Sequence, residues 1–251
     1  MISGNWGHLS ARYGLAGYPL GHSFSPAFFG EKFRKEAISA RYDAYPLEQA
    51  AAIPALIQSH DLRGLNVTIP HKEAVIPFLH HLDPHAAAIG AVNCIRVEAD
   101  GTLRGFNTDW LGFGKSLSGW SLSLPEGALI LGTGGAAKAV AYALTQLNIP
   151  FQNVSRKAGG GSLSYMDISG KLLDQYPLLI NTTPLGTFPE IAEKPPLDYS
   201  LLRPESLLYD LVYNPAETAF MKEGLQRGCR VKNGLEMLHI QAEESWHIWQ
   251  A

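Results

Sequence analysis

The sequence predicts an α/β fold with two domains, because strand-like apolar runs alternate with amphipathic segments in two separate series. The first series lies before residue 105, and the second begins at residue 128. Strands that alternate with helices favour βαβ units and a parallel sheet. The length of 251 residues is sufficient for two hydrophobic cores.

The first series contains short apolar runs that end in turn residues, with helical periodicity between them. The predicted strands cover 12–17, 41–45 and 64–69, and the predicted helices lie near 26–37 and 48–59.

The second series starts with the apolar run ALIL and continues with an alanine-rich helical pattern. Its predicted elements are a strand at 128–131, a helix at about 135–147, and strands near 151, at 177–181 and at 206–212.

Two helices fall outside these series. Thr108 or Asp109 is placed to cap a helix that crosses from the first series to the second. The segment 235–250 has an apolar stripe at spacings of three and four, which predicts a helix. Periodicity alone leaves open which domain this last helix packs against.

Composition excludes several classes of partner. The formal charge is -3 and 17% of residues are charged, which argues against nucleic acid and anionic membranes as partners. The sequence shows no basic and apolar leader and no run of ~18 apolar residues, so we expect neither export nor a membrane span. Cys94 and Cys229 lack CxxC spacing and are expected to be reduced, in a cytoplasmic protein.

A glycine cluster follows the first strand of the second series. Gly132, Gly134 and Gly135 would permit a tight turn and a close approach of the backbone to a pyrophosphate at a helix N-terminus. The cluster GTGGAA is a variant of GxGxxG with Ala137 at the third position. The alternative is a tight bend between strand and helix with no ligand.

The end of the next strand favours NADP over NAD. Between 150 and 158 there is no acidic residue to hold a ribose hydroxyl, and the strand ends in Ser155, Arg156 and Lys157. A guanidinium can grip a 2′-phosphate with paired hydrogen bonds. The alternative is a solvated basic turn.

Polar side chains gather near strand ends in the first series. Ser23 and Ser25 precede Pro26, which can open a helix, so their hydroxyls suit a carboxylate; a helix cap is the competing interpretation. Thr68 and Lys72 follow the strand at 64–69, where α/β proteins place ligands and a partly buried ammonium can exchange a proton. Taken alone, Lys72 could equally be a surface lysine, and Asn93 and Asp109 could be turn and cap residues.

Taken together, these stretches resemble the shikimate/quinate dehydrogenase family. The likeness runs from about residue 12 to 250 and rests on YPLGHSFSP, NVTIPHK, GAVNCI, FNTDWLGF, LGTGGAA, NTTPLG, DLVYNPAET and GLEMLHIQA in this order. It implies a substrate domain of residues 1–105 and 235–251, and a Rossmann-like NADP-binding domain of residues 106–234. It also implies an active site between the two domains.

The resemblance implies an enzyme that reversibly reduces 3-dehydroshikimate to shikimate with NADPH, without a metal, as a monomer or homodimer. Lys72 and Asp109 would be the catalytic pair, and the substrate would be held by Ser23, Ser25, Thr68, Lys72, Asn93, Asp109, Tyr213 and Gln241. The cofactor would be bound by Gly132, Thr133, Gly134, Gly135, Ala136, Ser155, Arg156, Lys157, Thr182, Leu211 and Gly234.

The chain departs from the family pattern at a few positions. Ser155 and Lys157 flank Arg156 where Asn and Thr are usual, which leaves the degree of NADP preference open. Thr187 stands where a methionine is common beside the nicotinamide. Cys94 replaces a threonine, and we expect a buried, inert thiol there.

Three alternatives remain. The same scaffold could serve quinate or another cyclohexane polyol, and the sequence does not decide between these substrates. A non-catalytic ligand sensor is disfavoured because Lys72 and Asp109 are both present. A metal hydrolase would need His80, His81 and His85, which Pro84 interrupts, or His239 with Glu243, which lacks a third ligand.

Overall fold

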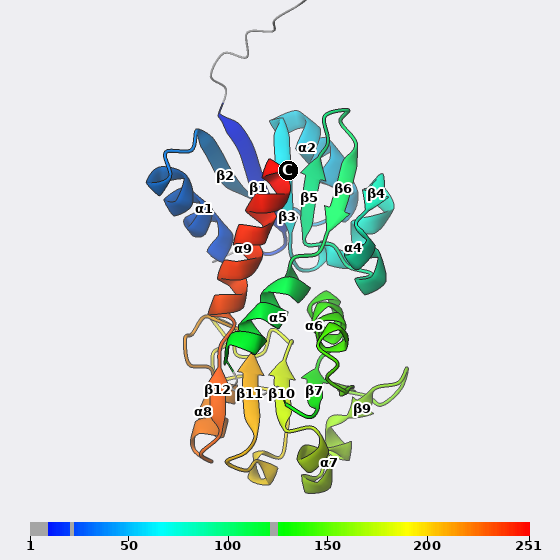
Figure 1. Ribbon diagram of the computed structural model, residues 1–251, viewed down its shortest axis with the longest axis vertical. Coiled ribbons are helices and arrows are strands. Elements are labelled where there is room, and N and C mark those ends of the chain that lie inside the picture. The colour runs from blue at the N-terminus through cyan, green and yellow to red at the C-terminus, as the bar shows by residue number, and fades with distance from the viewer. Residues whose placement is uncertain (1–9, 21–22, 121–124) are drawn as a thin grey trace, which may run out of the picture. The chain divides into compact units, whose positions relative to one another are not determined.

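The structure is a computed structural model that describes residues 10–20, 23–120 and 125–251, and it divides into two compact units (Figure 1). The first unit consists of Met1–Thr108 and Ala242–Ala251, and the second of Asp109–Gln241. The α/β fold predicted from the sequence is confirmed in both units. The sequence predicted a substrate domain of residues 1–105 and 235–251 and an NADP domain of residues 106–234. The assignment of each domain to its ligand stays a prediction.

The sheet of the first unit has the strand order β2-β1-β3-β5-β6-β4. Its strands are β1 (Ala11–Gly17), β2 (Ala40–Pro46), β3 (Leu62–Val67), β4 (His81–Leu82), β5 (Cys94–Val97) and β6 (Leu103–Phe106). Strand β1 pairs in parallel with β2 and β3, as predicted. Strand β5 pairs antiparallel with β3 and with β6, and a tight turn with Gly101 at φ +83° joins β5 to β6. The expected parallel sheet is therefore a mixed sheet.

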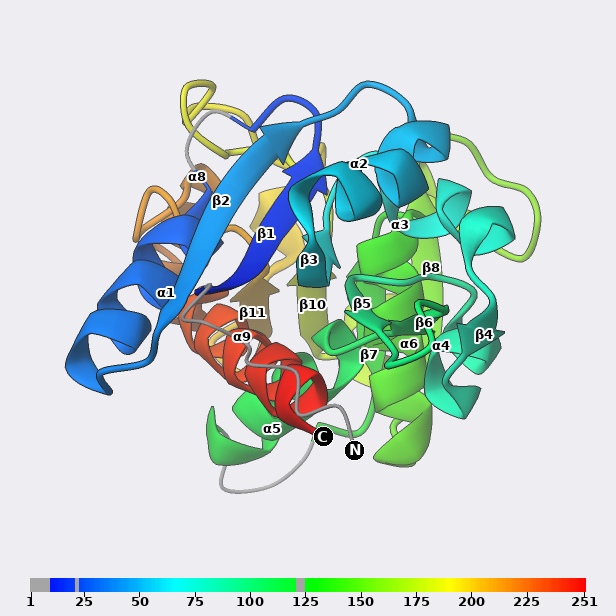
Figure 2. The ribbon, with the colours of Figure 1, turned by 90° about the horizontal axis from the view of Figure 1, so that it is seen from above.

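Helices cover both faces of this sheet (Figure 2). They are α1 (Phe24–Lys35), η1 (Ala50–Ala52), α2 (Ile53–His60), α3 (His71–Ala74), η2 (Ile76–Phe78), α4 (Pro84–Ile89) and the end of α9 (Leu235–Gln250). Alternate strand residues face opposite ways. Tyr13 and Leu15 pack with α1 and α9, whereas Leu65 and Val67 pack with α2. The C-terminal residues of α9 therefore complete the core of the first unit.

The sheet of the second unit is parallel and has the order β12-β11-β10-β7-β8-β9. Its strands are β7 (Ala128–Leu131), β8 (Phe151–Ser155), β9 (Leu163–Ser164), β10 (Leu178–Asn181), β11 (Leu207–Asp210) and β12 (Arg230–Lys232). Numbered from β7 along the chain, the order across the sheet is 3-2-1-4-5-6, which defines a Rossmann-like sheet.

The helices of the second unit pack on both faces of its sheet. They are α5 (Asp109–Trp120), α6 (Gly135–Gln146), η3 (Tyr165–Asp167), α7 (Gly170–Gln175), η4 (Tyr199–Leu201), α8 (Ala219–Leu225) and the start of α9. Ile130 of β7 faces α5 and α6, and Leu131 faces the core with α7 and α8. In the part of the chain that the structure describes, no helix is long and apolar enough to cross a bilayer.

Candidate functional site

The glycine turn lies where strand β7 passes into helix α6. Gly132 has φ +126°, in the region that favours glycine. A Cβ added to Gly132 would lie 2.4 Å from Thr182 Oγ1, which is too close for any residue other than glycine at this position. The Thr182 hydroxyl in turn donates to the Leu131 carbonyl oxygen at 2.8 Å. Gly132 and Thr182, two residues predicted to bind the cofactor and placed after different strands, are therefore in close contact.

This contact lies at the point where the strand order reverses. Strand β7 has β8 on one side and β10 on the other. After β7 the chain continues to β8 toward one edge of the sheet, and after β10 it continues to β11 toward the other edge. In open α/β sheets, ligands bind outside the carboxyl ends of the strands at such a switch point. Gly132 follows β7 directly and Thr182 follows β10 directly.

The helix N-terminus beside the turn is open to a ligand. Gly134 is the N-cap of α6, and a Cβ added there would meet nothing within 4 Å. Thr133 and Gly134 are exposed, and Gly135 and Ala136 begin the helix. The first backbone N–H groups of a helix and its dipole favour a phosphate. The turn therefore has room for the pyrophosphate of a dinucleotide, and that its residues bind one stays a prediction.

A second close approach joins the end of β11 to the start of α9. A Cβ added to Gly234 would lie 2.2 Å from the Leu211 carbonyl oxygen. The Leu211 N–H donates to the Asn181 carbonyl oxygen at 2.9 Å, which places Leu211 beside the end of β10. The predicted residues Thr182, Leu211 and Gly234 thus form one continuous region with Gly132.

The three residues predicted to contact a 2′-phosphate lie at the end of β8. Ser155 is the last residue of β8, and its hydroxyl donates to the Lys157 carbonyl oxygen. Arg156 and Lys157 are exposed. Their two cations are thus accessible at the strand end where dinucleotide-binding domains hold the adenosine ribose.

In the first unit, the predicted carboxylate-binding serines lie at the N-terminus of α1. Ser23 is the N-cap, and Ser25 lies in the first turn with only 8% of its surface exposed. The helix starts at Phe24, two residues before Pro26, so Ser25 belongs to the helix and does not cap it. Its side chain hydrogen-bonds the hydroxyl of Tyr42, a buried residue of β2. This bond fixes Ser25 beside the sheet.

Thr68 and Lys72 follow β3, as predicted. The Thr68 N–H donates to the Ala16 carbonyl oxygen, and the Thr68 carbonyl accepts from the His71 N–H, both at 2.9 Å. Lys72 lies in α3, is half-buried, and accepts the Val92 N–H at 2.7 Å through its carbonyl oxygen. The backbone at Thr68 is therefore bonded to β1, and the backbone at Lys72 is bonded to the segment before β5.

Asn93 is buried and is tied to the residue before Asp109. Its Oδ1 accepts from the Thr108 N–H at 2.7 Å, and its Nδ2 donates to Thr108 Oγ1 at 3.0 Å. Asp109 opens helix α5 directly after Thr108 and is 5% exposed. Asn93 thus fixes the backbone that presents the Asp109 carboxylate.

Asp109 and Gln241 lie on two helices that pack closely in the second unit. Gly112, one turn after Asp109, has no room for a side chain, because an added Cβ would lie 2.8 Å from the Met237 carbonyl oxygen and 3.1 Å from Gln241 Cβ. Gln241 is 6% exposed and donates from Nε2 to the Leu238 carbonyl oxygen at 3.1 Å. Tyr213, half-buried, follows β11. That Asp109, Gln241 and Tyr213 contact the substrate stays a prediction.

Sequence analysis missed two functional candidates among the polar residues of the second unit. Asp210 and Asn181, at paired positions of β11 and β10, are both 0% exposed and are hydrogen-bonded at 2.9 Å. The signal was a polar residue at the end of each apolar run, LLYD and LLIN. That signal is weak, because turn residues end most strands.

The structure also describes the surroundings of a cysteine and a histidine singled out in the sequence. Cys94 is fully buried, as predicted, and burial raises the pKa of its thiol to about 12; its lack of reactivity stays a prediction. His80 accepts the Leu103 N–H through Nδ1 at 2.9 Å. Within 10–20, 23–120 and 125–251, no three His, Cys, Asp or Glu side chains lie close enough to share a metal ion.

These features define a class of protein. A Rossmann-like unit with a glycine turn at its switch point, joined to a second α/β unit with a lysine at a strand end, is the architecture of a dinucleotide-dependent oxidoreductase with a separate substrate domain.

Comparison with known proteins gives the particular family. Residues 15–95 match the family described as the shikimate dehydrogenase substrate binding domain. The chain is 37% identical to the shikimate dehydrogenase (NADP(+)) of Geobacillus kaustophilus, over 94% of this chain and 91% of that protein. The chain belongs to the shikimate dehydrogenase family.

Solved structures agree with this assignment. The shikimate 5-dehydrogenase of Thermus thermophilus in complex with NADP(H) and shikimate has a TM-score of 0.85 at 31% identity, over 95% of this chain and 93% of that chain. The Listeria monocytogenes enzyme in complex with shikimate and NAD has a TM-score of 0.81 at 26% identity, over 100% and 94%.

Proposed function

We propose that the protein catalyses the reversible, NADP-dependent reduction of 3-dehydroshikimate to shikimate. The observation that carries the proposal is the contact of Gly132 with Thr182 at the switch point of the second unit, in a chain related along nearly its whole length to NADP-dependent shikimate dehydrogenases. A turn that excludes a side chain and an open helix N-terminus are what a bound pyrophosphate requires.

In this proposal NADP is held by the second unit. Gly132, Thr133, Gly134, Gly135 and Ala136 bind the pyrophosphate. Ser155, Arg156 and Lys157 bind the 2′-phosphate, and their exposed cations support NADP over NAD. Thr182, Leu211 and Gly234 line the nicotinamide, which supplies or accepts the hydride when bound.

The first unit, with Asp109, Tyr213 and Gln241, supplies the substrate contacts. Ser23 and Ser25 at the N-terminus of α1 bind the substrate carboxylate, aided by the helix dipole. Thr68 and Asn93 hold ring hydroxyls, together with Lys72, Asp109 and Gln241, and Tyr213 lies near the carboxylate.

Lys72 and Asp109 carry the proton chemistry. Reduction of a ketone builds negative charge on its oxygen, which the Lys72 ammonium stabilises and then protonates. The Asp109 carboxylate orients that ammonium. In the reverse direction, Lys72 accepts the proton of the hydroxyl that is oxidised.

A four-way assay tests this function. Purified protein is incubated with shikimate or quinate, each with NADP⁺ or NAD⁺, and reduced nicotinamide is followed by absorbance. We expect the highest kcat/KM with shikimate and NADP⁺. A higher kcat/KM with quinate would assign the enzyme to the quinate alternative, and absence of turnover in all four mixtures would leave a non-catalytic sensor.

Some finer expectations belong to the same proposal. A cytoplasmic location agrees with two buried cysteines that form no disulfide and with a biosynthetic reaction on small molecules. The protein would act as a monomer or homodimer on small-molecule ligands. Fractionation and light scattering test these two points.

A further inference from the structure

A buried carboxylate lies at the end of strand β11, beside the proposed nicotinamide contacts. Asp210 is 0% exposed. Its Oδ1 accepts from Asn181 Nδ2 at 2.9 Å and from the Val212 N–H at 3.0 Å, and its Oδ2 accepts from Thr218 Oγ1 at 2.6 Å. Burying a carboxylate is costly unless such donors surround it. Three bonds to three chain segments suggest a role that an apolar residue could not fill.

One of these bonds fixes the loop after β10. Asn181 Oδ1 accepts from the Thr183 N–H at 3.0 Å and from Thr183 Oγ1 at 2.6 Å. Asn181 Nδ2 also donates to the Leu185 carbonyl oxygen at 3.3 Å. Asp210 therefore sets the amide orientation of Asn181, and Asn181 sets the course of the loop that contains Thr182.

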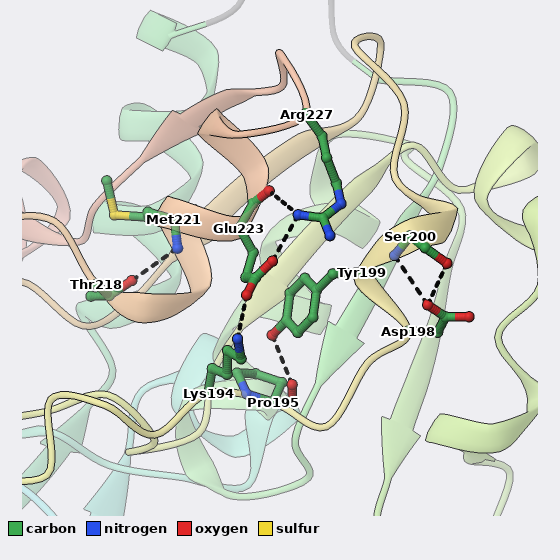
Figure 3. A network of polar contacts seen from close by, with 9 residues as sticks. All are labelled: Lys194, Pro195, Asp198, Tyr199, Ser200, Thr218, Met221, Glu223 and Arg227. Atoms are coloured by element: carbon green, nitrogen blue, oxygen red, sulfur yellow. Dashed lines mark hydrogen bonds and ion pairs between the residues drawn. The ribbon is translucent and has the colours of Figure 1, made fainter.

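The other two bonds fix the loop after β11 at both ends. Val212 lies at its start, and Thr218 at its end is the N-cap of α8, accepting the Met221 N–H at 3.2 Å (Figure 3). Leu211 lies between Asp210 and Val212 in this loop. A single carboxylate thus holds the two loops that carry Thr182 and Leu211.

The surrounding ion pairs stabilise a different part of α8. Glu223 contacts both Lys194 and Arg227, and Tyr199 donates to the Pro195 carbonyl oxygen at 2.7 Å (Figure 3). These groups hold α8 against the segment before η4. They do not bond Asp210, so the Asp210 cluster can be altered without removing them.

We propose that Asp210 is a positioning residue that holds the loops of Thr182 and Leu211 against Gly132 and Gly234, and so sets the place of the nicotinamide half of NADP. The inference rests on the proposed function. It assigns no part to Asp210 in binding the adenosine half, because that half belongs to the β7–β8 side of the sheet.

The test compares two ligands that differ in the nicotinamide half. Full-length Asp210→Asn is titrated with NADP⁺ and with adenosine 2′,5′-bisphosphate, which has the 2′-phosphate but no nicotinamide. The amide oxygen of the variant can still accept two of the bonds, but its NH2 group cannot accept from Thr218 Oγ1 and it carries no charge, so the hold on the two loops weakens. We expect NADP⁺ affinity and kcat each to fall about tenfold, with adenosine 2′,5′-bisphosphate affinity and the KM for shikimate within about twofold of wild type.

Asp198→Asn is the matched control. Asp198 is another carboxylate of the second unit that accepts hydrogen bonds, from the Ser200 N–H at 3.0 Å and Ser200 Oγ at 2.6 Å, but it lies at the N-cap of η4 (Figure 3). We expect it to leave both ligand affinities unchanged. If Asp210→Asn does not fold, Thr218→Val takes its place, because it removes the donor to Oδ2 and retains the branched shape.

Two results would overturn the inference while leaving the proposed function intact: equal weakening of both ligands, or unchanged NADP⁺ affinity and kcat in a folded variant. A wild-type protein that binds neither ligand would instead overturn the proposed cofactor, and the inference with it.

Discussion

At the scale of single residues, Lys72 carries the proton step in the proposed reaction. Lys72→Ala removes the ammonium that stabilises and protonates the developing oxyanion, so we expect kcat to fall about 10²–10⁴-fold. The half-buried side chain contributes little to the core, and thermal unfolding should be nearly unchanged. Steady-state kinetics with shikimate and NADP⁺ measure the effect.

The control for this variant is Lys35→Ala. Lys35 is an exposed lysine of α1 that pairs with Glu31 at 2.6 Å, and its loss should leave kcat unchanged. Near-wild-type turnover in folded Lys72→Ala would remove this lysine from the mechanism.

Arg156 should decide between the two cofactors. Arg156→Ala removes the guanidinium proposed to grip the 2′-phosphate, which NAD⁺ lacks, so KM for NADP⁺ should rise about tenfold or more while KM for NAD⁺ changes little. Arg203→Ala, which removes an exposed arginine paired with Asp174, provides the control. An equal rise for both cofactors would show that Arg156 does not contact the phosphate.

At the scale of elements, Asp210 at the end of β11 should make the stability of the protein depend on pH. Burial raises the pKa of Asp210 from 3.8 to about 6, and its three hydrogen bonds oppose this rise only in part. The native state therefore binds more protons than the unfolded state between about pH 4 and pH 6. Stability from this group is fully present below pH 3.8 and is lost as pH rises through about 6.

Asp210→Asn removes this titration. We expect the wild type, relative to the variant, to lose on the order of 3 kcal/mol of unfolding free energy between pH 3.5 and pH 7. Urea unfolding of both proteins at each pH gives the comparison, in which the contributions of other carboxylates cancel. Parallel pH profiles for the two proteins would show that the pKa of Asp210 is the same in the native and unfolded states, so that burial does not raise it.

The elements that sequence analysis found are those with strong periodicity or a glycine signal. The run ALIL, the glycine turn and the helix that follows were predicted within a residue or two of β7 and α6. The short strands β5 and β6 were missed, because the four-residue stretches CIRV and LRGF carry too little alternation to stand out. Their hairpin makes the first sheet mixed.

The same limit applies to the site. The glycines, the serines and the strand-end lysine each had a plain structural alternative, and they were visible as a site because the stretches that contain them together resemble a known family. The hydrogen bond between Asn181 and Asp210 joins residues 29 apart in the chain, and it depends on the register of β10 and β11. Local sequence does not encode that register, so the pair became visible only in the structure.

At the scale of the whole molecule, the chain leaves the first unit at Thr108 and returns to it at Ala242. The returning segment carries Trp249, which is 8% exposed, stacks on Tyr13 at 4.8 Å, and donates from Nε1 to the Ile95 carbonyl oxygen at 3.0 Å. Its indole also occupies the space beside Gly64, where an added Cβ would lie 2.3 Å away. The core of the first unit therefore depends on the last helical turns of the chain.

Trp249→Ala should consequently destabilise the first unit by about 3–5 kcal/mol, because it leaves a large cavity and removes the hydrogen bond from the indole to the Ile95 carbonyl. The second unit has its own core, so NADP⁺ affinity should persist under mild urea that abolishes shikimate binding. Trp120→Ala is the control, since Trp120 borders the core of the second unit beside Tyr209. Simultaneous loss of both ligands in Trp249→Ala would mean that the two units unfold as one cooperative body, in which case the returning helix couples the cofactor unit to the substrate unit.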